Sequence, residues 1–229
     1  MEKNRKRLGV VAAMDKEYLL LKELLDNPKE ESIAGFRLCT GTSGGKEICL
    51  MKSGIGKVAA ATGINLMKYR YAPEAVINSG VAGGMREDLQ VGEIVAGTHC
   101  VYHDVDCGTG NEYGQVQGFP ARYAADACLL AAVKRQQVKD GLICTGDQFI
   151  QDPGQLESIR RHFPEVTAVD MESAAMAQVC HIWQIPFLSL RIISDTPGRK
   201  ADNMAQYNDF WELAPQRNFA VLKDLLAAI

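Results

Sequence analysis

The chain has 229 residues, of which 47% are hydrophobic, and it carries a formal net charge of −3 at pH 7. A chain of this length can bury one full core, so we expect a single domain over residues 1–229. The slightly negative charge and a pI near 5.8 provide no basic field for a phosphate backbone. The composition therefore argues against a nucleic-acid partner and favours a small-molecule one.

The cysteines and the chain start indicate where the protein works. The seven cysteines are widely spaced, without a Cys-x-x-Cys pair, which predicts reduced thiols in a cytoplasmic protein and no metal site. The apolar stretch after the basic start MEKNRKR is too short for a signal peptide. No run approaches the roughly 20 apolar residues that span a bilayer, so we expect no membrane contact.

Short runs rich in Val and Ile alternate with longer amphipathic stretches, the pattern of a sheet covered by helices. The predicted strands are residues 8–13, 36–40, 48–52, 75–79, 93–102, 141–145, 168–169 and 187–194. The predicted helices are residues 16–25, 57–69, 124–136, 153–161, 172–182 and 207–229. This order predicts the α/β class, with a large, curved central sheet flanked by helices.

Two connecting segments carry more specific expectations. Residues 36–48 read as a hairpin through GTSGGKE, so the sheet is expected to be mixed rather than purely parallel. Residues 104–122 are rich in glycine and weakly periodic, and a loop of this length is more often functional than a simple connector. We expect this loop to contact either the substrate pocket or a second subunit.

Acidic residues follow several predicted strands, at the sheet edge where open α/β sheets usually form their sites. In VVAAMDKE, local rules alone make Asp15 a helix cap and Glu17 a partner of the helix dipole. Asp170, Glu172 and Asp195 also stand at strand ends, where core packing has no use for charge. The apolar run before Asp195 predicts burial and a raised pKa for its carboxyl, unless Arg191 or another neighbour pairs with it.

Two glycine-rich segments, KSGIGKVAA and NSGVAGG, allow backbone amides to approach a ligand closely. Neither has the spacing of a dinucleotide fingerprint or of a P-loop, so binding of a nucleotide phosphate is not supported. Each segment alone is a weak signal.

In their order along the chain, AAMDKE, SGIGKVAAA, NSGVAGG, YHDVD, TGDQFI, VDMESAA and RIISD resemble the purine nucleoside phosphorylase/nucleosidase superfamily. The resemblance covers nearly the whole chain and is strongest to the methylthioadenosine/S-adenosylhomocysteine nucleosidases. It implies a single domain with a twisted mixed central sheet, chemistry without cofactor or metal, and a homodimer in which a loop of one subunit closes the other's pocket.

The resemblance also implies roles for individual residues. Glu17 would activate water as general base, and Asp195 would protonate N7 of the adenine leaving group as general acid. Glu172 would accept hydrogen bonds from the ribose hydroxyls. Six further residues would contact the nucleoside: Phe149 stacked on adenine, Ile150 on its Watson–Crick edge, Met171 beside the sugar, Met14 and Ile55 at the ribose and 5′ region, and Tyr207 over the 5′ substituent.

General chemistry supports this allocation. Cleavage of an N-glycosidic bond through an oxocarbenium-like transition state needs an acid on the leaving base and an activated water, as in inverting glycosidases. A phosphorolytic relative would need cations around a phosphate, yet no arginine lies between Arg7 and Arg37. The carboxylate of Glu17 would repel phosphate, so hydrolysis is favoured.

Three departures from the family pattern bear on the site. Val81, also expected to line the nucleoside site, stands where a serine often helps to hold the catalytic aspartate. Asp195 is therefore expected to depend on backbone amides of a turn at residues 80–84. Asp170 stands where the family commonly has Glu, and we expect this change to be tolerated. The loop CGTGNEYGQVQGF is less apolar than usual, so the preferred 5′ substituent stays open.

The leading hypothesis is a cytoplasmic nucleosidase that hydrolyses methylthioadenosine and S-adenosylhomocysteine. One alternative is a nucleoside phosphorylase or an aminofutalosine-type nucleosidase on the same scaffold. Another is a non-catalytic nucleoside-binding protein, against which the presence of Glu17, Glu172 and Asp195 argues. His103 is interpreted as structural, the segment with Arg199 and Lys200 as a solvated loop rather than a pocket lid, and Trp183 and Trp211 as packing or dimer residues.

Overall fold

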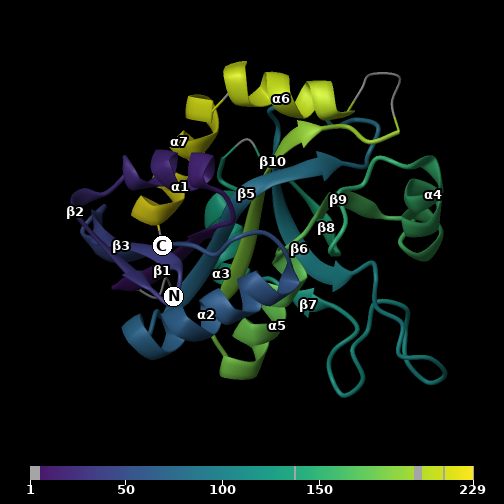
Figure 1. Cartoon of the computed structure of the whole chain (residues 1–229), viewed down its shortest axis with the longest axis horizontal. Helices are drawn as coiled ribbons and strands as arrows, with labels where there is room; N and C mark the ends of the chain where they lie inside the picture. The colour runs from purple at the N-terminus through teal and green to yellow at the C-terminus, as the bar shows by residue number, and fades with distance from the viewer. Residues whose placement is uncertain (1–5, 137, 199–202, 214, 229) are drawn as a thin grey trace.

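The computed structural model describes residues 6–136, 138–198, 203–213 and 215–228 (Figure 1). Within them, ten strands form one mixed sheet. The strands are β1 (Arg7–Ala12), β2 (Asp26–Ile33), β3 (Phe36–Ser43), β4 (Lys46–Lys52), β5 (Ala75–Gly84), β6 (Ile94–Tyr102), β7 (Tyr123–Ala124), β8 (Lys139–Thr145), β9 (Val166–Asp170) and β10 (Phe187–Asp195). The helices are α1 (Asp15–Lys22), α2 (Lys57–Tyr71), α3 (Ala127–Val133), α4 (Pro153–His162), α5 (Ser173–Trp183), α6 (Asn203–Leu213) and α7 (Pro215–Ala228).

Part of the sheet closes on itself. β10 pairs in parallel with β5 and antiparallel with β6. From β6 the pairing continues through β8 and β9, and β9 returns antiparallel to β5, so five strands form a ring. The strands β1, β4, β3 and β2 extend outward from β5. The predicted α/β class and mixed, curved sheet are thus confirmed.

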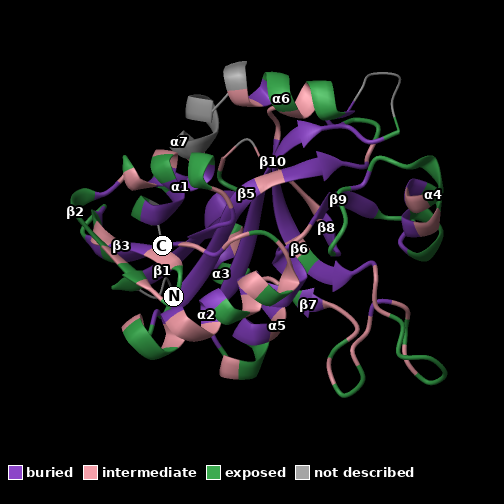
Figure 2. Ribbon diagram, in the orientation of Figure 1, coloured by how far each residue is buried: buried purple, intermediate pink, exposed green. Residues whose placement is uncertain are grey.

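Helices cover both faces of the sheet. The helices α1, α3 and α7 pack on one face through a cluster that includes Tyr18, Leu129 and Leu225. On the other face α2 and α5 pack through Ile64 and Met176. Strands buried from both sides need apolar residues at nearly every position, which is why β1, β5 and β10 appear as continuous buried runs (Figure 2).

The hairpin predicted from residues 36–48 is confirmed. β3 and β4 pair antiparallel, and Ser43 lies opposite Lys46 with only Gly44 and Gly45 between them. Both glycines have positive φ angles, 56° and 77°, as a two-residue hairpin turn of this kind requires.

Several element boundaries were wrong. The segment DNPKEESI was left without an element, but it forms the edge strand β2, whose exposed, polar side chains give no apolar alternation. β5 continues to Gly84, five residues beyond the predicted end, so residues 80–84 are strand and not a turn. The predicted helix 124–136 is shorter, as α3, and the C-terminal helix is two helices, because Pro215 starts a new one.

The loop of residues 104–122 is only partly anchored. Val105, Val116 and Phe119 pack against the α2–α5 side of the core. Cys107, Gly108 and their neighbours are exposed. Among the described residues, no helix is both long enough and apolar enough to cross a membrane.

Candidate active site

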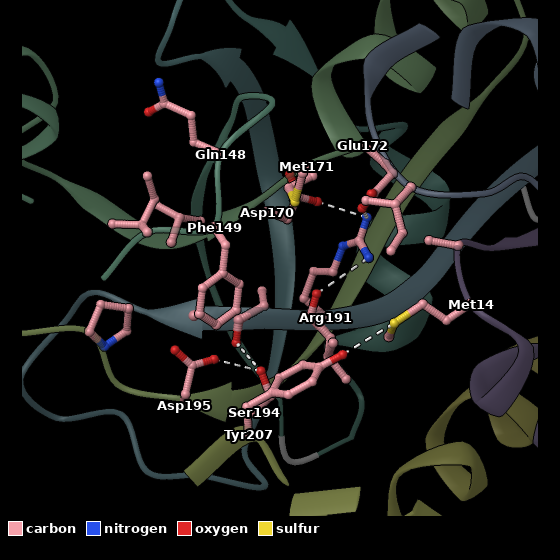
Figure 3. A pocket seen from close by; sticks show the side chains of 18 of the residues that line it. Met14, Gln148, Phe149, Asp170, Met171, Glu172, Arg191, Ser194, Asp195 and Tyr207 are labelled. Atoms are coloured by element: carbon pink, nitrogen blue, oxygen red, sulfur yellow. Dashed lines mark hydrogen bonds and ion pairs between the residues drawn. The ribbon is translucent and has the colours of Figure 1, made fainter. Parts of the chain in front are cut away.

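One pocket lies where β1, β5, β9 and β10 meet the loop after β8 and the helix α6 (Figure 3). All ten residues that the sequence predicted for the site line this pocket. They are Met14, Glu17, Ile55, Val81, Phe149, Ile150, Met171, Glu172, Asp195 and Tyr207. The fold therefore brings together residues from seven separate segments of the chain.

Glu17 sits in the first turn of α1 and is 1% exposed. Its Oε2 accepts hydrogen bonds from the backbone N–H groups of Ala13 and Met14, both at 2.9 Å, and its Oε1 accepts one from Val81 at 3.1 Å. Burial raises the pKa of Glu17, while these N–H groups and the nearby charge of Arg191 oppose the rise. A buried carboxylate held by three backbone donors is well fixed in orientation.

The local interpretation of Asp15 as a helix cap was wrong. Met14 occupies the N-cap position, and Asp15 is the first helical residue. The Asp15 carboxylate instead forms ion pairs with Arg37 at 2.9 Å and Lys52 at 3.0 Å. Glu17 does bind the N-cap backbone, but its contact with Val81 on β5 extends beyond any helix-end role.

Asp195 ends β10 and is 2% exposed. Burial raises the pKa of its carboxyl to about 6, and a hydrogen bond from the adjacent Ser194 hydroxyl opposes the rise. Arg191 does not pair with it, since the guanidinium contacts Asp170 instead. The predicted direction of the pKa shift thus agrees with the structure, and a carboxyl of this kind can donate a proton near neutral pH.

The expected support for Asp195 from backbone amides of residues 80–84 was wrong. Those residues belong to β5, and the amide of Val81 donates to Glu17 rather than to Asp195. In the described part of the chain, the hydrogen bond that Asp195 accepts comes from Ser194 Oγ at 2.7 Å.

Glu172 precedes α5 and is 5% exposed. Its Oε1 accepts the backbone N–H of Gly56 at 3.0 Å, and its Oε2 lies 3.7 Å from Nη2 of Arg191. Burial raises the pKa of Glu172 to about 7 against the opposing charge of Arg191, and the neighbouring Asp170 adds to the rise. Gly56, from the segment SGIGK, thus supplies a backbone donor at close range.

Two aromatic rings border the open side of the pocket. Phe149, which is 38% exposed, meets Tyr207 edge to face with ring centroids 5.9 Å apart. The Tyr207 hydroxyl donates to Sδ of Met14 at 3.2 Å (Figure 3). Aromatic faces next to a polar floor suit a flat heterocycle attached to a polar group.

Arg191 is the main residue of the pocket that was not predicted as a site residue from the sequence. It is 1% exposed, lines the pocket and pairs with Asp170 at 2.7 Å. An arginine between Leu190 and Ile192 in a buried strand is a signal that could have identified it, because a buried charge needs a partner. Gln148, Ser194 and Met204 also line the pocket.

Other predicted features lie elsewhere. The loop of residues 104–122 is absent from the pocket lining of its own chain, and so is the buried His103. Trp211 packs edge to face on Tyr207, and Trp183 donates to Asn65. Arg199 and Lys200 fall outside the described residues. Among the side chains that are described, no group of three or more His, Cys, Asp or Glu residues could hold a metal ion.

Comparison with known proteins identifies the relatives of this fold and site. The family model of the phosphorylase superfamily matches residues 7–227. The 5′-methylthioadenosine/S-adenosylhomocysteine nucleosidase of Bacillus subtilis is 43% identical over 216 residues, 91% of this chain and 93% of the relative. That of Anoxybacillus flavithermus is 43% identical over 203 residues, 85% and 88% of the two chains.

The similar solved structures are nucleosidases of the same kind as these relatives. A nucleosidase of the same name from Neisseria meningitidis, in complex with methylthio-immucillin-A, superposes with a TM-score of 0.93 at 38% identity and covers 98% and 100% of the two chains. The enzyme from Colwellia psychrerythraea, in complex with adenine, gives 0.92 at 33% identity over 100% and 97%. The matches place the chain in the phosphorylase superfamily. Within it, the chain belongs to the methylthioadenosine/S-adenosylhomocysteine nucleosidases.

Proposed function

We propose that the protein hydrolyses the N-glycosidic bond of 5′-methylthioadenosine and S-adenosylhomocysteine, releasing adenine and the 5-thioribose product. Its relatives at 43% identity carry this name, and two structural neighbours were solved with adenine or methylthio-immucillin-A. The observation that carries the proposal is the pairing in one pocket of a buried acid, Asp195, with a fixed carboxylate, Glu17.

In the proposed mechanism Asp195 donates a proton to N7 of adenine as the glycosidic bond breaks. Its pKa of about 6 leaves a useful protonated fraction near neutral pH. Glu17 removes a proton from the attacking water, for which its ionised form is required. The three backbone N–H donors to Glu17 favour that ionised form and hold the carboxylate in one orientation. The carboxylate can then accept a further hydrogen bond, from the attacking water, in one fixed direction.

The other pocket residues bind and orient the nucleoside. Glu172 accepts hydrogen bonds from the ribose hydroxyls, and Met171 packs beside the sugar. Phe149 stacks on adenine, while the backbone of Ile150 reads its polar edge. Met14, Ile55, Val81 and Tyr207 enclose the ribose and the 5′ substituent, and all of these residues line the pocket. No step in this sequence requires a cofactor.

The site favours water over phosphate as the attacking group. A phosphate next to Glu17 would meet a buried carboxylate, with Glu172 close by and the charge of Arg191 already engaged by Asp170. Arg191 is the one cationic residue among the described residues that line the pocket, so burying a phosphate there would be costly. Hydrolysis needs only a neutral water at the same position.

The test is adenine release from methylthioadenosine by the purified protein in phosphate-free buffer, repeated with phosphate added. Equal rates support hydrolysis, whereas release only with phosphate would make the protein a phosphorylase. Aminofutalosine, 5′-deoxyadenosine and S-adenosylhomocysteine in the same assay rank the 5′ substituents. Adenine binding without cleavage of any of them would favour the non-catalytic alternative.

We also propose a homodimer. Val58 and Tyr69 on α2 and Ile182 on α5 are 79%, 75% and 53% exposed, although all three are large and apolar or aromatic. These two helices pack against each other next to the exposed loop of residues 104–122. A second subunit that covered this surface could bring that loop to its partner's pocket. Sedimentation at the mass of one chain, 25.1 kDa, would contradict the dimer.

Two broader assignments complete the proposal. The chain forms one domain over residues 1–229, which the match of the superfamily model to residues 7–227 supports. The protein works in the cytoplasm, consistent with seven free cysteines, five of them buried.

A further inference from the structure

The buried cation Arg191 faces three buried carboxylates, and all four side chains line the pocket. The Nη2 atom of Arg191 lies 2.7 Å from Asp170 and 3.7 Å from Glu172. Nη1 of Arg191 and Oε1 of Glu17 both lie beside Gly80, where an added Cβ would overlap the guanidinium and lie 3.0 Å from that oxygen. Each of the four charged side chains is no more than 7% exposed, so solvent screens them little.

Asp170 is the carboxylate most firmly held in this cluster. It accepts hydrogen bonds from Thr145 Oγ1 at 2.5 Å, from the backbone N–H of Ser173 at 3.2 Å and from the Ser173 hydroxyl. The same Ser173 oxygen accepts from Nε and Nη2 of Arg191 at 3.2 and 3.0 Å. Asp170 and the guanidinium are therefore joined directly, as Figure 3 shows, and also through the shared hydroxyl of Ser173.

We infer that Asp170 is a positioning residue of the reaction, which anchors the Arg191 guanidinium where it faces both Glu17 and Glu172. The proposed mechanism gives Asp170 no contact with substrate, so its effect passes through Arg191. The inference rests on the proposed function only for the roles of Glu17 and Glu172. It also gives the acidic residue at position 170 a task separate from that of Glu172.

Charge balance gives the inference its measurable consequence. Arg191 cannot neutralise three carboxylates at once, and its short ion pair with Asp170 leaves Glu172 and Glu17 only partly compensated. Removing the charge of Asp170 would remove a like charge near Glu172 and free the guanidinium for the two glutamates. Both effects lower the pKa of the glutamates. The other titratable groups that face this cluster are Cys100 on β6, His103 after β6, Cys144 on β8, Asp195 on β10 and Tyr207 on α6.

The test compares Asp170→Asn, which keeps the shape of the side chain and removes its charge, with Asp170→Glu, which keeps the charge. Carboxyl carbons of ¹³C-labelled glutamate are titrated by NMR, with Glu172→Gln used to assign the Glu172 signal. We expect the midpoint of Glu172 to fall by about one pH unit in Asp170→Asn and to stay near the wild-type value in Asp170→Glu. The acid limb of kcat/KM, set by the proton on Glu17, should move the same way.

A matched control is Asp140→Asn, because Asp140 pairs with Lys134 on the surface and does not line the pocket. It should leave both the titration and the acid limb unchanged. An Asp170→Asn protein that loses activity while the Glu172 midpoint and the acid limb stay in place would overturn the inference and leave Asp170 a purely structural role. If Asp170→Asn does not fold, Asp170→Ser removes the same charge with a smaller side chain and is read in the same way.

The two proposals fail in different ways. A wild-type protein that releases no adenine contradicts the proposed function, but the NMR titration needs no turnover and still tests whether Asp170 positions Arg191. Conversely, if the wild type hydrolyses normally and the titration midpoint of Glu172 is unchanged in Asp170→Asn, only the positioning role of Asp170 is contradicted.

Discussion

The hydroxyl of Ser194 donates a 2.7 Å hydrogen bond to Oδ1 of Asp195, the next residue along β10. Neighbouring residues in a strand point to opposite faces, so this contact depends on the end of the strand, where the pairing of β10 with β5 shifts register between Ile193 and Asp195. Val81 offers no hydroxyl at the position where the family resemblance implies a serine. Among the described residues, Ser194 is therefore the side chain that binds the carboxyl of Asp195.

Ser194→Ala should raise the pKa of Asp195 above about 6, because the lost hydrogen bond favours the ionised form. As general acid, Asp195 must be protonated, so the alkaline limb of kcat/KM should move to higher pH. A pH–rate profile between pH 5 and 9 measures the shift. Ser43→Ala, at a buried serine on β3 away from the pocket, is the control. An alkaline limb that stays in place would contradict this relationship.

Asp195→Asn should lower turnover of methylthioadenosine by about 10²-fold or more and leave the fold intact, because an amide cannot donate the proton. Its oxygen can still accept the hydrogen bond from Ser194. Turnover at saturating substrate and the far-UV circular dichroism spectrum check both parts. Activity close to wild type would remove Asp195 from the role of general acid.

The same variant should change stability with pH in a defined direction. The folded-state pKa of Asp195 is about 6, against an ordinary value of 3.8, so the native state binds this proton more tightly than the unfolded state. Its contribution to stability is present below about pH 4 and is lost as pH rises through 6. The free energy of unfolding of Asp195→Asn, taken relative to wild type, should thus be on the order of 2 kcal/mol higher at pH 8 than at pH 4. Urea unfolding of both proteins at both pH values tests this. The same difference in unfolding free energy between variant and wild type at pH 4 and at pH 8 would contradict it.

Glu17→Gln should lower turnover by about 10²-fold while nucleoside binding is kept, because the amide cannot accept a proton from water. The amide has a single acceptor oxygen for the three backbone donors, so some loss of stability, about 1–3 kcal/mol, is also expected. Calorimetric titration with adenine separates binding from catalysis. Loss of binding in parallel with turnover would show that Glu17 serves mainly to shape the pocket.

Gly80→Ala should reduce both stability and turnover, because its methyl group would overlap the Arg191 guanidinium and press on Glu17. We expect a loss of about 1–3 kcal/mol in unfolding free energy and at least 10-fold in kcat. Gly45→Ala, which meets nothing within 4 Å but has a φ of 77°, controls for a substitution that strains only the backbone. A Gly80→Ala protein with full activity would mean that the cluster around Arg191 can shift without consequence.

Strong local patterns predicted most of the fold. The apolar runs of β1, β4 and β10 and the helix α2 were found within a few residues of their observed bounds, since burial on both faces leaves long apolar stretches. The strand β2 was missed because an exposed edge strand carries polar residues at nearly every position. Its extended form comes from pairing with β3, a contact that no local pattern encodes.

The chain itself determined the α/β class, the hairpin and, through its resemblance to known nucleosidases, ten of the residues that line the pocket. Side-chain partners were decided only by the tertiary structure. Arg191 pairs with Asp170 rather than Asp195, and Glu17 receives the N–H of Val81, 64 residues away. Local sequence predicts elements because their periodicity is local, whereas the partner of a buried charge depends on which strands close the ring of β5, β10, β6, β8 and β9.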